Sequence, residues 1–276
     1  MKISIITITF QAEKFLEKTI QSVFAQTYPS IEYWIIDGAS RDNTIAIAEK
    51  YAKQCPPNIV MHIQSEPDKG LYDAMNKGLQ KATGDYVVFL NAGDYIASAD
   101  VLEKSIDCAP NADVYFGETM CINEENQVIG LRSQITTQIL PQKLTWKSLR
   151  YGMVVCHQAM IVRRAIAPFY RTKHRYSADI DWVIEVLKKA KKIQPTNIVM
   201  VNYLLGGFSQ KHLRKSLIDR FWVLSRHFGF VPTLLRHFWI VLRAFFHKFL
   251  SRATFKSPAT LMLSVMLFCI TISIAS

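Results

Sequence analysis

The first 94 residues alternate short apolar runs with segments of helical periodicity, and this alternation limits the possible folds more than any other feature. β-branched and aromatic residues dominate four runs, at residues 3–10, 33–36, 60–64 and 86–90. Between the runs, apolar residues recur at helical spacing in residues 12–26, 42–53 and 71–81. Strands and helices that alternate at such short intervals predict an α/β fold, with a mostly parallel sheet flanked by helices on both faces.

Polar side chains follow the apolar runs at the points where the strands are predicted to end. Thr9 follows the first run, Asp37 the second, Asp68 the third, and the sequence NAGD at 91–94 the fourth. Ligands of parallel sheets bind beyond the carboxyl ends of the strands. A single acid at such a point is usually a helix cap or a turn residue. Acids after three successive strands favour a binding crevice at one edge of the sheet.

The chemistry of this edge indicates a metal-bridged nucleotide. The turn after the first run, residues 9–13, contains no glycine, and the phosphate-binding patterns GxGxxG and GxxxxGK[ST] are missing from the sequence. Carboxylates repel phosphates unless a divalent cation lies between them, and Mg²⁺ or Mn²⁺ binds through one or two carboxylates together with phosphate oxygens. We therefore expect a divalent cation, with Asp94 as its ligand.

The middle of the chain is less regular. It predicts strands at residues 114–117, 127–132, 154–162 and 198–204, and a helix at 178–192. His157 and Gln158 lie inside the third of these predicted strands, and Asp179 and Asp181 lie near the start of the helix. A histidine in an apolar strand is more often a core residue than a ligand.

Five segments resemble family 2 glycosyltransferases with the GT-A fold. They are ISIITITF at the start, IIDGASRDNT, SEPDKGLYDAMNKGLQKATGDYVVFLNAGD, CHQAMIVRR and SADIDW. The resemblance covers roughly residues 1–210, and its nearest branch is that of bacterial exopolysaccharide transferases of the colanic-acid type. It implies an inverting, metal-dependent hexosyltransferase (EC 2.4) that uses a nucleotide-diphosphate sugar. The acceptor would be a saccharide, lipid-linked, in cell-surface polysaccharide biosynthesis.

The resemblance also implies roles for individual residues of the donor pocket. Thr9 and Asp37 would line the pocket for the nucleobase and ribose. Asp68 would contact the nucleoside, and Lys69 and Gly70 would bring their backbone close to it.

The catalytic positions depart from the family pattern. Residues 91–94 occupy the place of the DxD motif, but Asn91 and Gly93 stand where the motif has acids, so Asp94 alone keeps a carboxylate. In the ED motif, Ala178 replaces the first acid and Asp179 matches the second, the general base. Asp181 is the second candidate for the base, and it points away from Asp179 on a helix.

Four more residues are candidates for substrate binding through the same resemblance. Asp73 and Asn76 lie three apart and so share a helix face, whose alternative role is a solvated face or a cap. His157 and Gln158 match a family element near the acceptor or the diphosphate, and core packing is the alternative for His157.

The altered motifs leave a second function open. A degenerate transferase fold would act as a non-catalytic nucleotide-sugar-binding or scaffolding subunit at the membrane. A membrane-tethered nucleic-acid binder ranks last because the predicted crevice is acidic, so we expect no nucleic acid as partner.

The positive charge of the chain is concentrated near its C-terminal end. Residues 211–256 hold ten Lys and Arg residues and one acid, so this window carries nine of the eleven net positive charges. Aromatic residues interleave with the basic ones, which is typical of amphipathic helices on anionic lipid. Residues 258–276 contain no charged side chain and reach about 28 Å as a helix, near the thickness of a bilayer core.

These features predict three parts: a transferase domain at 1–210, basic aromatic amphipathic helices at 211–256 and a hydrophobic membrane-associated segment at 257–276. Basic residues before the hydrophobic segment place the enzyme on the cytoplasmic face of the bacterial inner membrane, peripheral or with one C-terminal span. The five cysteines have no CxxC spacing and no signal peptide precedes the first strand, so we expect reduced thiols.

Overall fold

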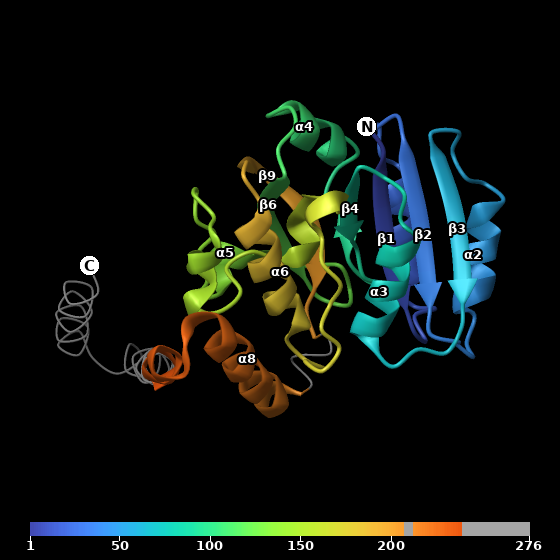
Figure 1. Cartoon of the computed structure of the whole chain (residues 1–276). Helices are drawn as coiled ribbons and strands as arrows, with labels where there is room; N and C mark the ends of the chain where they lie inside the picture. The colour runs from blue at the N-terminus through green and yellow to red at the C-terminus, as the bar shows by residue number, and fades with distance from the viewer. Residues whose placement is uncertain (207–211, 239–276) are drawn as a thin grey trace, which may run out of the picture. The chain divides into compact units, whose positions relative to one another are not determined.

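The computed structural model describes residues 1–206 and 212–238 (Figure 1). The chain divides into two compact units, Met1–Leu224 and Ser225–Ser276. The first unit contains the sheet and all of the predicted site residues. It also contains the first part of the basic segment that the sequence predicts to begin at residue 211, and the three-part division of the chain stays a prediction.

One nine-stranded sheet forms the frame of the first unit. Its order is β3-β2-β1-β4-β8-β6-β9-β5, and β7 pairs with β6. The strands are β1 (Ile3–Thr9), β2 (Ile31–Asp37), β3 (Ile59–Ser65), β4 (Tyr86–Phe89), β5 (Tyr95–Ile96), β6 (Val114–Ile122), β7 (Val128–Leu131), β8 (Met160–Arg163) and β9 (Ile193–Leu204). β1 to β4 run parallel, whereas β8 is antiparallel to β4 and β6.

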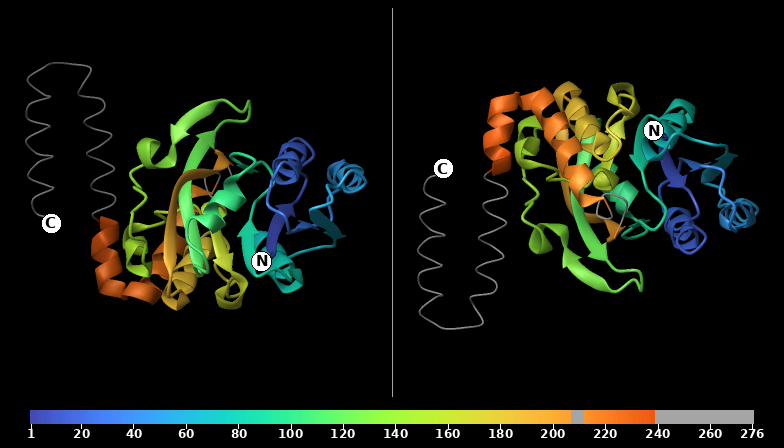
Figure 2. Two further views of the ribbon diagram at one scale, coloured as in Figure 1. Left: turned by 90° about the horizontal axis from the view of Figure 1, so that it is seen from above. Right: turned by 90° about the horizontal axis from the view of Figure 1, so that it is seen from below.

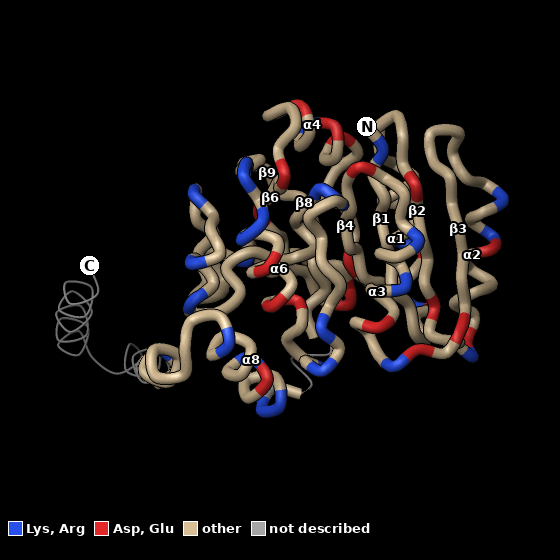
Figure 3. The backbone as a smooth tube through the Cα atoms, in the orientation of Figure 1, with Lys and Arg blue, Asp and Glu red and all other residues tan. Residues whose placement is uncertain are grey.

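The register of the parallel strands brings predicted site residues into one row. Thr9 lies opposite Asp37, and Asp37 lies opposite Ser65. Because all three strands end here, the row marks the carboxyl edge of the sheet, where ligands of parallel sheets bind. Figure 3 shows acidic residues below this edge, under the carboxyl ends of β2 and β3.

Helices cover both faces of the sheet (Figures 1 and 2). The helices are α1 (Leu16–Phe24), α2 (Thr44–Ala52), α3 (Leu71–Lys81), α4 (Val101–Asp107), α5 (Arg132–Ile135), α6 (Ala178–Lys189) and α8 (Leu213–Phe228). Alternate strand residues such as Ile3 and Ile5 share a buried cluster with residues of α1, α2 and α4. On the opposite face, Ile6 packs on Gly78 of α3 and Phe89 packs on Trp182 of α6.

The fold class predicted from the sequence is confirmed, and α3 has the predicted bounds. The strand predicted at 154–162 is wrong in its first part. Residues His157–Ala159 form a 3₁₀ turn, and β8 begins at Met160. Within this turn the side chain of Gln158 donates a hydrogen bond to the buried Asp94 of another loop, a long-range contact that the local pattern does not contain.

The predicted membrane segment at 257–276 lies outside the described residues. In the part of the chain that the structure describes, no helix combines the length and the apolar character needed to cross a bilayer. The four cysteines described, Cys55, Cys108, Cys121 and Cys156, are free thiols, as the sequence predicts.

Candidate active site

Thr9 and Asp37 bond to each other and to the neighbouring turn. The hydroxyl of Thr9 donates to Asp37 Oδ1 across 2.9 Å. Ser40 donates through its hydroxyl to Oδ1 and through its backbone N–H to Oδ2, and Ser65 donates to Oδ2. Asp37 is 0% exposed and Thr9 1%. The pair therefore fixes the turn at residues 38–40, and its polar atoms are committed to the protein itself.

An exposed aromatic ring and a carboxylate meet beside this turn. Phe10 follows β1 directly and is 64% exposed. A Cβ on Gly38 would lie 2.5 Å from Asp68 Oδ2 and 3.3 Å from Phe10 Cδ2, so only glycine leaves room for both groups. Asp68 Oδ1 accepts the backbone N–H of Gly70. An open ring face beside a carboxylate oxygen suits a nucleobase, which stacks through its face and donates through its edge.

Sequence reasoning did not select Phe10. The signal was available, because an aromatic residue stands immediately after the polar end of the first strand, at the edge where ligands bind. Lys69, in contrast, was selected and lies exposed at the N-terminal end of α3. Gly70 next to it has φ +110, in the left-handed region that favours glycine.

The two predicted residues of α3 hold the protein's own backbone. Asp73 Oδ2 accepts the N–H of Lys69 across 3.0 Å. Asn76 donates from Nδ2 to the carbonyl of Tyr170 and accepts the N–H of Tyr170 at Oδ1, across 2.9 and 2.7 Å. Both polar groups of Asn76 are thus used to fix Tyr170 against α3, and the structure gives Asn76 a positioning role.

Asp94 lies inside the fold. Its side chain is 3% exposed, Oδ1 accepts the N–H of Leu204 and Oδ2 accepts from Nε2 of Gln158, each across 2.9 Å. Burial raises the pKa of Asp94 to about 7, although both hydrogen bonds oppose the rise. This environment gives each oxygen of Asp94 one partner within the protein, and the predicted role of Asp94 as a metal ligand stays a prediction. It also accounts for Gln158, which serves the carboxylate rather than a substrate.

The rest of the 91–94 loop offers one oxygen. Gly93 has φ +99, and a Cβ there would lie 2.8 Å from Leu204 Cδ2, so an acid does not fit at this position. Asn91 Oδ1 is buried and has no hydrogen-bond partner among the described residues. Mg²⁺ and Mn²⁺ normally take one or two carboxylates. The loop therefore offers a cation the unpartnered amide oxygen of Asn91, and its one carboxylate, Asp94, already accepts two hydrogen bonds from the protein.

Asp179 is a half-buried carboxylate at the start of α6. Oδ1 accepts the phenol of Tyr72 across 3.2 Å and the N–H of Ile180 across 2.9 Å. Within the described residues no hydrogen bond involves Oδ2. Burial raises the pKa of Tyr72 well above its ordinary value, and the charge of Asp179 adds to the rise, so the phenol stays protonated as a donor. One oxygen of Asp179 is thus fixed by the protein, and the other can accept a proton.

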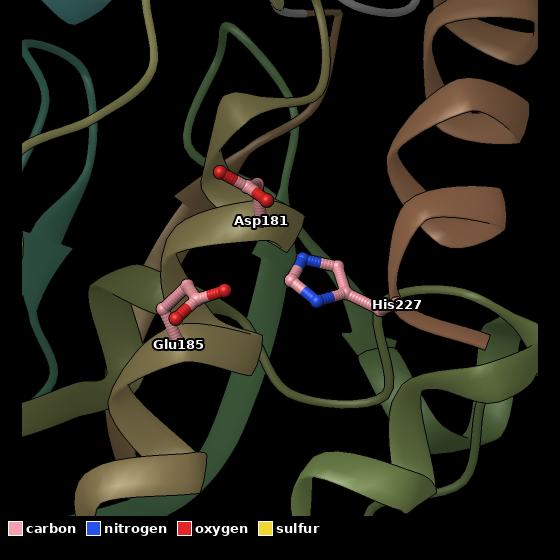
Figure 4. A group of neighbouring side chains, drawn as sticks. All are labelled: Asp181, Glu185 and His227. Carbon is pink, nitrogen blue, oxygen red and sulfur yellow. The ribbon is translucent and has the colours of Figure 1, made fainter.

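Asp181, the second candidate for the base, is engaged in an ion pair. It is 2% exposed, and Nη1 of Arg171 lies 2.9 and 3.0 Å from its two oxygens. Glu185 lies on the next turn of α6 (Figure 4). Its Oε1 is 3.7 Å from Nη2 of the same arginine. Asp181 is therefore buried and paired, whereas Asp179 keeps one oxygen without a hydrogen bond in the described part of the chain.

Aromatic rings pack around Asp179. Tyr170 stacks between Tyr72 and Trp182, with centroid distances of 5.5 and 5.2 Å, and Phe89 contacts both Tyr170 and Trp182 edge-on. Tyr72, the ring of this cluster that bonds Asp179, is itself buried, and electrostatic interactions are stronger where water is excluded.

His157 lies beside the same rings. It is 6% exposed, and its Nε2 is a buried atom without a hydrogen-bond partner in the described part of the chain. Burial lowers its pKa below the ordinary value, although Asp179 acts in the opposite direction. His157 is therefore a neutral imidazole at pH 7, with one nitrogen unused by the protein.

The exposed ring of Phe10 and a carboxylate oxygen of Asp68 follow the ends of β1 and β3, and the half-buried Asp179 lies at the start of α6. Residues 4–167 match the model of the family described as Glycosyl transferase family 2, which is more than half of the chain. The chain belongs to this family. The transferase is 31% identical over 218 residues to the putative glycosyltransferase EpsE of Bacillus subtilis, covering 78% of this chain and 71% of EpsE. It is 41% identical over 106 residues to an uncharacterized glycosyltransferase of Mycobacterium tuberculosis, and this match spans only 38% of either protein.

Solved structures of low sequence identity share the fold. The structure of S. aureus TarS 1-349 in complex with UDP has a TM-score of 0.61 at 18% identity, and covers 84% of this chain and 71% of that one. The mannosyltransferase PcManGT from Pyrobaculum calidifontis, in complex with GDP-Man and Mn²⁺, has a TM-score of 0.58 at 16% identity, with 99% and 80% covered. These likenesses confirm the GT-A architecture of the transferase.

Proposed function

We propose that the transferase is an inverting enzyme that moves a sugar from a nucleotide-diphosphate sugar to a saccharide acceptor, with Asp179 as the general base. The observation that carries this proposal is the asymmetry of the Asp179 carboxylate. Tyr72 and the N–H of Ile180 hold Oδ1, while Oδ2 has no partner among the described residues. A positioned carboxylate with one available oxygen is what proton removal from an acceptor hydroxyl requires.

The reaction follows from this placement. The acceptor oxygen attacks the anomeric carbon of the donor sugar, and its proton passes to Oδ2 of Asp179. The bond between the anomeric carbon and the diphosphate oxygen breaks, and its electron pair leaves with the nucleoside diphosphate. Because attack and departure occur on opposite faces, the anomeric configuration inverts. No covalent enzyme intermediate is needed.

The donor pocket of this proposal lies at the ends of β1, β2 and β3. Phe10 offers an exposed ring to the base, and Asp68 offers a carboxylate oxygen beside Gly38. The TarS and PcManGT complexes support a nucleotide ligand for the fold, since they contain UDP and GDP-Man.

We also propose that a divalent cation binds together with the diphosphate of the donor. The Mn²⁺ of the PcManGT complex supports it. In this chain Asn91 Oδ1 is the loop atom that would contact it, so phosphate oxygens and water would supply most ligands. The chemistry that such a cation supplies is neutralisation of the charge on the diphosphate.

The acceptor side of the proposal includes a lipid-linked saccharide of cell-surface polysaccharide biosynthesis and a peripheral position on the cytoplasmic face of the bacterial inner membrane. The first turns of α8 support it. Ile218 and Trp222 are 61% and 56% exposed there, close in sequence to the exposed Arg214 and Lys215. An exposed apolar and basic helix favours anionic lipid. Sedimentation with vesicles tests it, because vesicles rich in phosphatidylglycerol should retain the protein and purely zwitterionic vesicles should not.

The decisive experiment compares Asp179→Asn with Asp107→Asn, an exposed control on α4. Thermal unfolding with a panel of nucleoside diphosphates first identifies the donor nucleotide. Asp179→Asn should still bind that nucleotide and should lose about 10²–10⁴-fold in sugar transfer or nucleotide-sugar hydrolysis, the range of a general base. Asp107→Asn should match the native protein. A native protein that binds nucleotide without turnover would instead support the non-catalytic scaffolding subunit.

A further inference from the structure

The N-terminal part of α8 is hydrogen-bonded to residues 174–177, which precede the proposed base Asp179. Asp219 Oδ1 lies 2.7 Å from His174 Nδ1, and Oδ2 accepts the backbone N–H groups of Tyr176 and Ser177 across 2.9 and 3.1 Å. The hydroxyl of Ser177 in turn donates to the carbonyl of Ser216. Since α6 begins at the next residue, these bonds fix α8 relative to the start of the helix that carries Asp179.

Arg220, the residue after Asp219, has a partly buried guanidinium beside Gly152. Its Nε atom is buried and has no hydrogen-bond partner in the residues described. Its Nη1 lies 3.9 Å from the point where a Cβ of Gly152 would stand, and Nε2 of Gln138 lies 3.7 Å from the same point. Gly152 has φ +121 and lacks a side chain, so the guanidinium borders a space that a side chain would fill.

Arg132 supplies a second guanidinium at this place. It begins α5, and its Nη1 and Nη2 donate to the carbonyls of Val154 and Met153. Burial lowers the pKa of Arg220, Asp179 opposes this, and Arg132 adds to it, so the three charged groups interact. Arginine nevertheless stays protonated in proteins. Neither arginine forms a salt bridge among the described residues, so neither positive charge is neutralised by an acidic side chain there.

The position of the pair decides which substrate it meets. In an inverting displacement the base and the acceptor occupy one face of the sugar, and the leaving diphosphate occupies the other. A guanidinium beside the base therefore reaches the acceptor rather than the leaving group. Arginine binds phosphate oxygens through two parallel hydrogen bonds, and partial burial strengthens them.

We propose that Arg220 and Arg132 form a cationic subsite that binds a phosphate group of the acceptor next to the hydroxyl that reacts. This inference rests on the proposed function, since it names the acceptor of the same site. It narrows the acceptor to a phosphate-bearing saccharide. The phosphate can belong to an isoprenoid-linked diphosphate or to a sugar phosphate without a lipid, and the two share the chemistry that the arginines recognise.

The test measures anion binding by calorimetry on the full chain saturated with the donor nucleotide. The probes are geranyl diphosphate and inorganic pyrophosphate, with geraniol as the uncharged control. Arg220→Gln and Arg132→Gln should each weaken geranyl diphosphate binding about tenfold or more, the loss expected for a charge-assisted hydrogen bond. Lys53→Gln, at an exposed residue just after α2, should bind as the native protein does. Preference for geranyl diphosphate over pyrophosphate indicates the lipid-linked source, and equal binding indicates the lipid-free one.

Two results would overturn the subsite. One is anion binding that survives both Arg→Gln substitutions unchanged. The other is a loss of affinity for the donor nucleotide in Arg220→Gln, which would place the arginines on the leaving group. Arg220→Lys is the control for misfolding. It keeps the positive charge but removes the planar guanidinium, so it should bind the anion with intermediate affinity. Failure of the proposed function would give different results. The native protein would bind no nucleotide, or sugar transfer would be the same in the native protein and in Asp179→Asn.

Discussion

The phenol of Tyr72 on α3 donates a hydrogen bond to Oδ1 of Asp179 on α6, and 107 residues of sequence separate the two. Tyr72 is itself stacked on Tyr170, whose backbone is held by Asn76. The orientation of the proposed base therefore depends on packing between two helices that lie on the same face of the sheet.

Tyr72→Phe removes this hydrogen bond and keeps the ring. Because the carboxylate loses a fixed donor, we expect sugar transfer to fall about 10- to 100-fold, in line with ~1.5–3 kcal/mol for a hydrogen bond to a charged group. Steady-state kinetics should show the loss in kcat, and nucleotide affinity should stay unchanged. Tyr151→Phe, at an exposed tyrosine, is the matched control. Transfer at the native rate in Tyr72→Phe would remove the phenol from the mechanism.

Asn91→Asp restores a carboxylate where the structure has an unpartnered amide oxygen. A charged oxygen binds Mn²⁺ more strongly than a neutral one, so the gain in nucleoside diphosphate affinity on adding Mn²⁺ should increase about tenfold. Calorimetry with and without EDTA measures it. Asp94→Asn should leave the Mn²⁺ effect as it is in the native protein, because both oxygens of Asp94 are committed to Leu204 and Gln158. Loss of the Mn²⁺ effect in Asp94→Asn would restore Asp94 as the ligand.

Asp94 should also make the stability of the native protein depend on pH. Its pKa rises from an ordinary value of 3.8 to about 7 in the folded protein. Between these values the folded state keeps a proton that the unfolded state has released, so the contribution of Asp94 to the free energy of unfolding falls as pH rises through this window. Urea unfolding at pH 5 and pH 8 should show the native protein losing stability relative to Asp94→Asn. An equal difference at both pH values would contradict the raised pKa.

Asp219→Asn weakens the attachment of α8. The carboxylate accepts hydrogen bonds from two backbone N–H groups and pairs with His174. A neutral amide oxygen accepts weaker hydrogen bonds from the same groups. We expect a loss of about 1.5–3 kcal/mol of stability by urea unfolding. Geranyl diphosphate affinity should fall with it because Arg220 loses its fixed position, whereas nucleotide affinity should persist. Asp107→Asn should change none of the three measurements.

Local patterns predicted the frame of this protein. The bounds of α3 and the start of β1 follow from apolar periodicity and from turn residues, which act within a few positions of the chain. The short β5 and the four-residue α5 escaped prediction because each depends on distant partners. Tyr95 of β5, for example, pairs with Asn202.

Site residues were predicted less evenly. Thr9 and Asp37 lie in one row at the sheet edge as expected, because parallel register brings strand ends together, and Asp179 lies near the start of a helix, as predicted. Phe10, Tyr72 and Arg220 were missed. The exposure of a side chain and the groups that it contacts depend on the folded structure, and the residue type alone does not give them. The predicted roles of Asn76 and Gln158 depended on a motif, and the structure gives both side chains partners within the protein.

The sequence by itself determined the alternation of strands and helices, the edge at which polar groups collect and the family of the chain. Tertiary structure alone decided which of those polar groups are available. Asp94 accepts a hydrogen bond from an N–H group 110 residues away, and Asp181 forms an ion pair with Arg171. Asp179 has one oxygen that accepts no hydrogen bond among the described residues. The reason is physical: a carboxylate has the same chemistry wherever it stands, and its pKa and its function follow from burial and from the donors that folding brings to it.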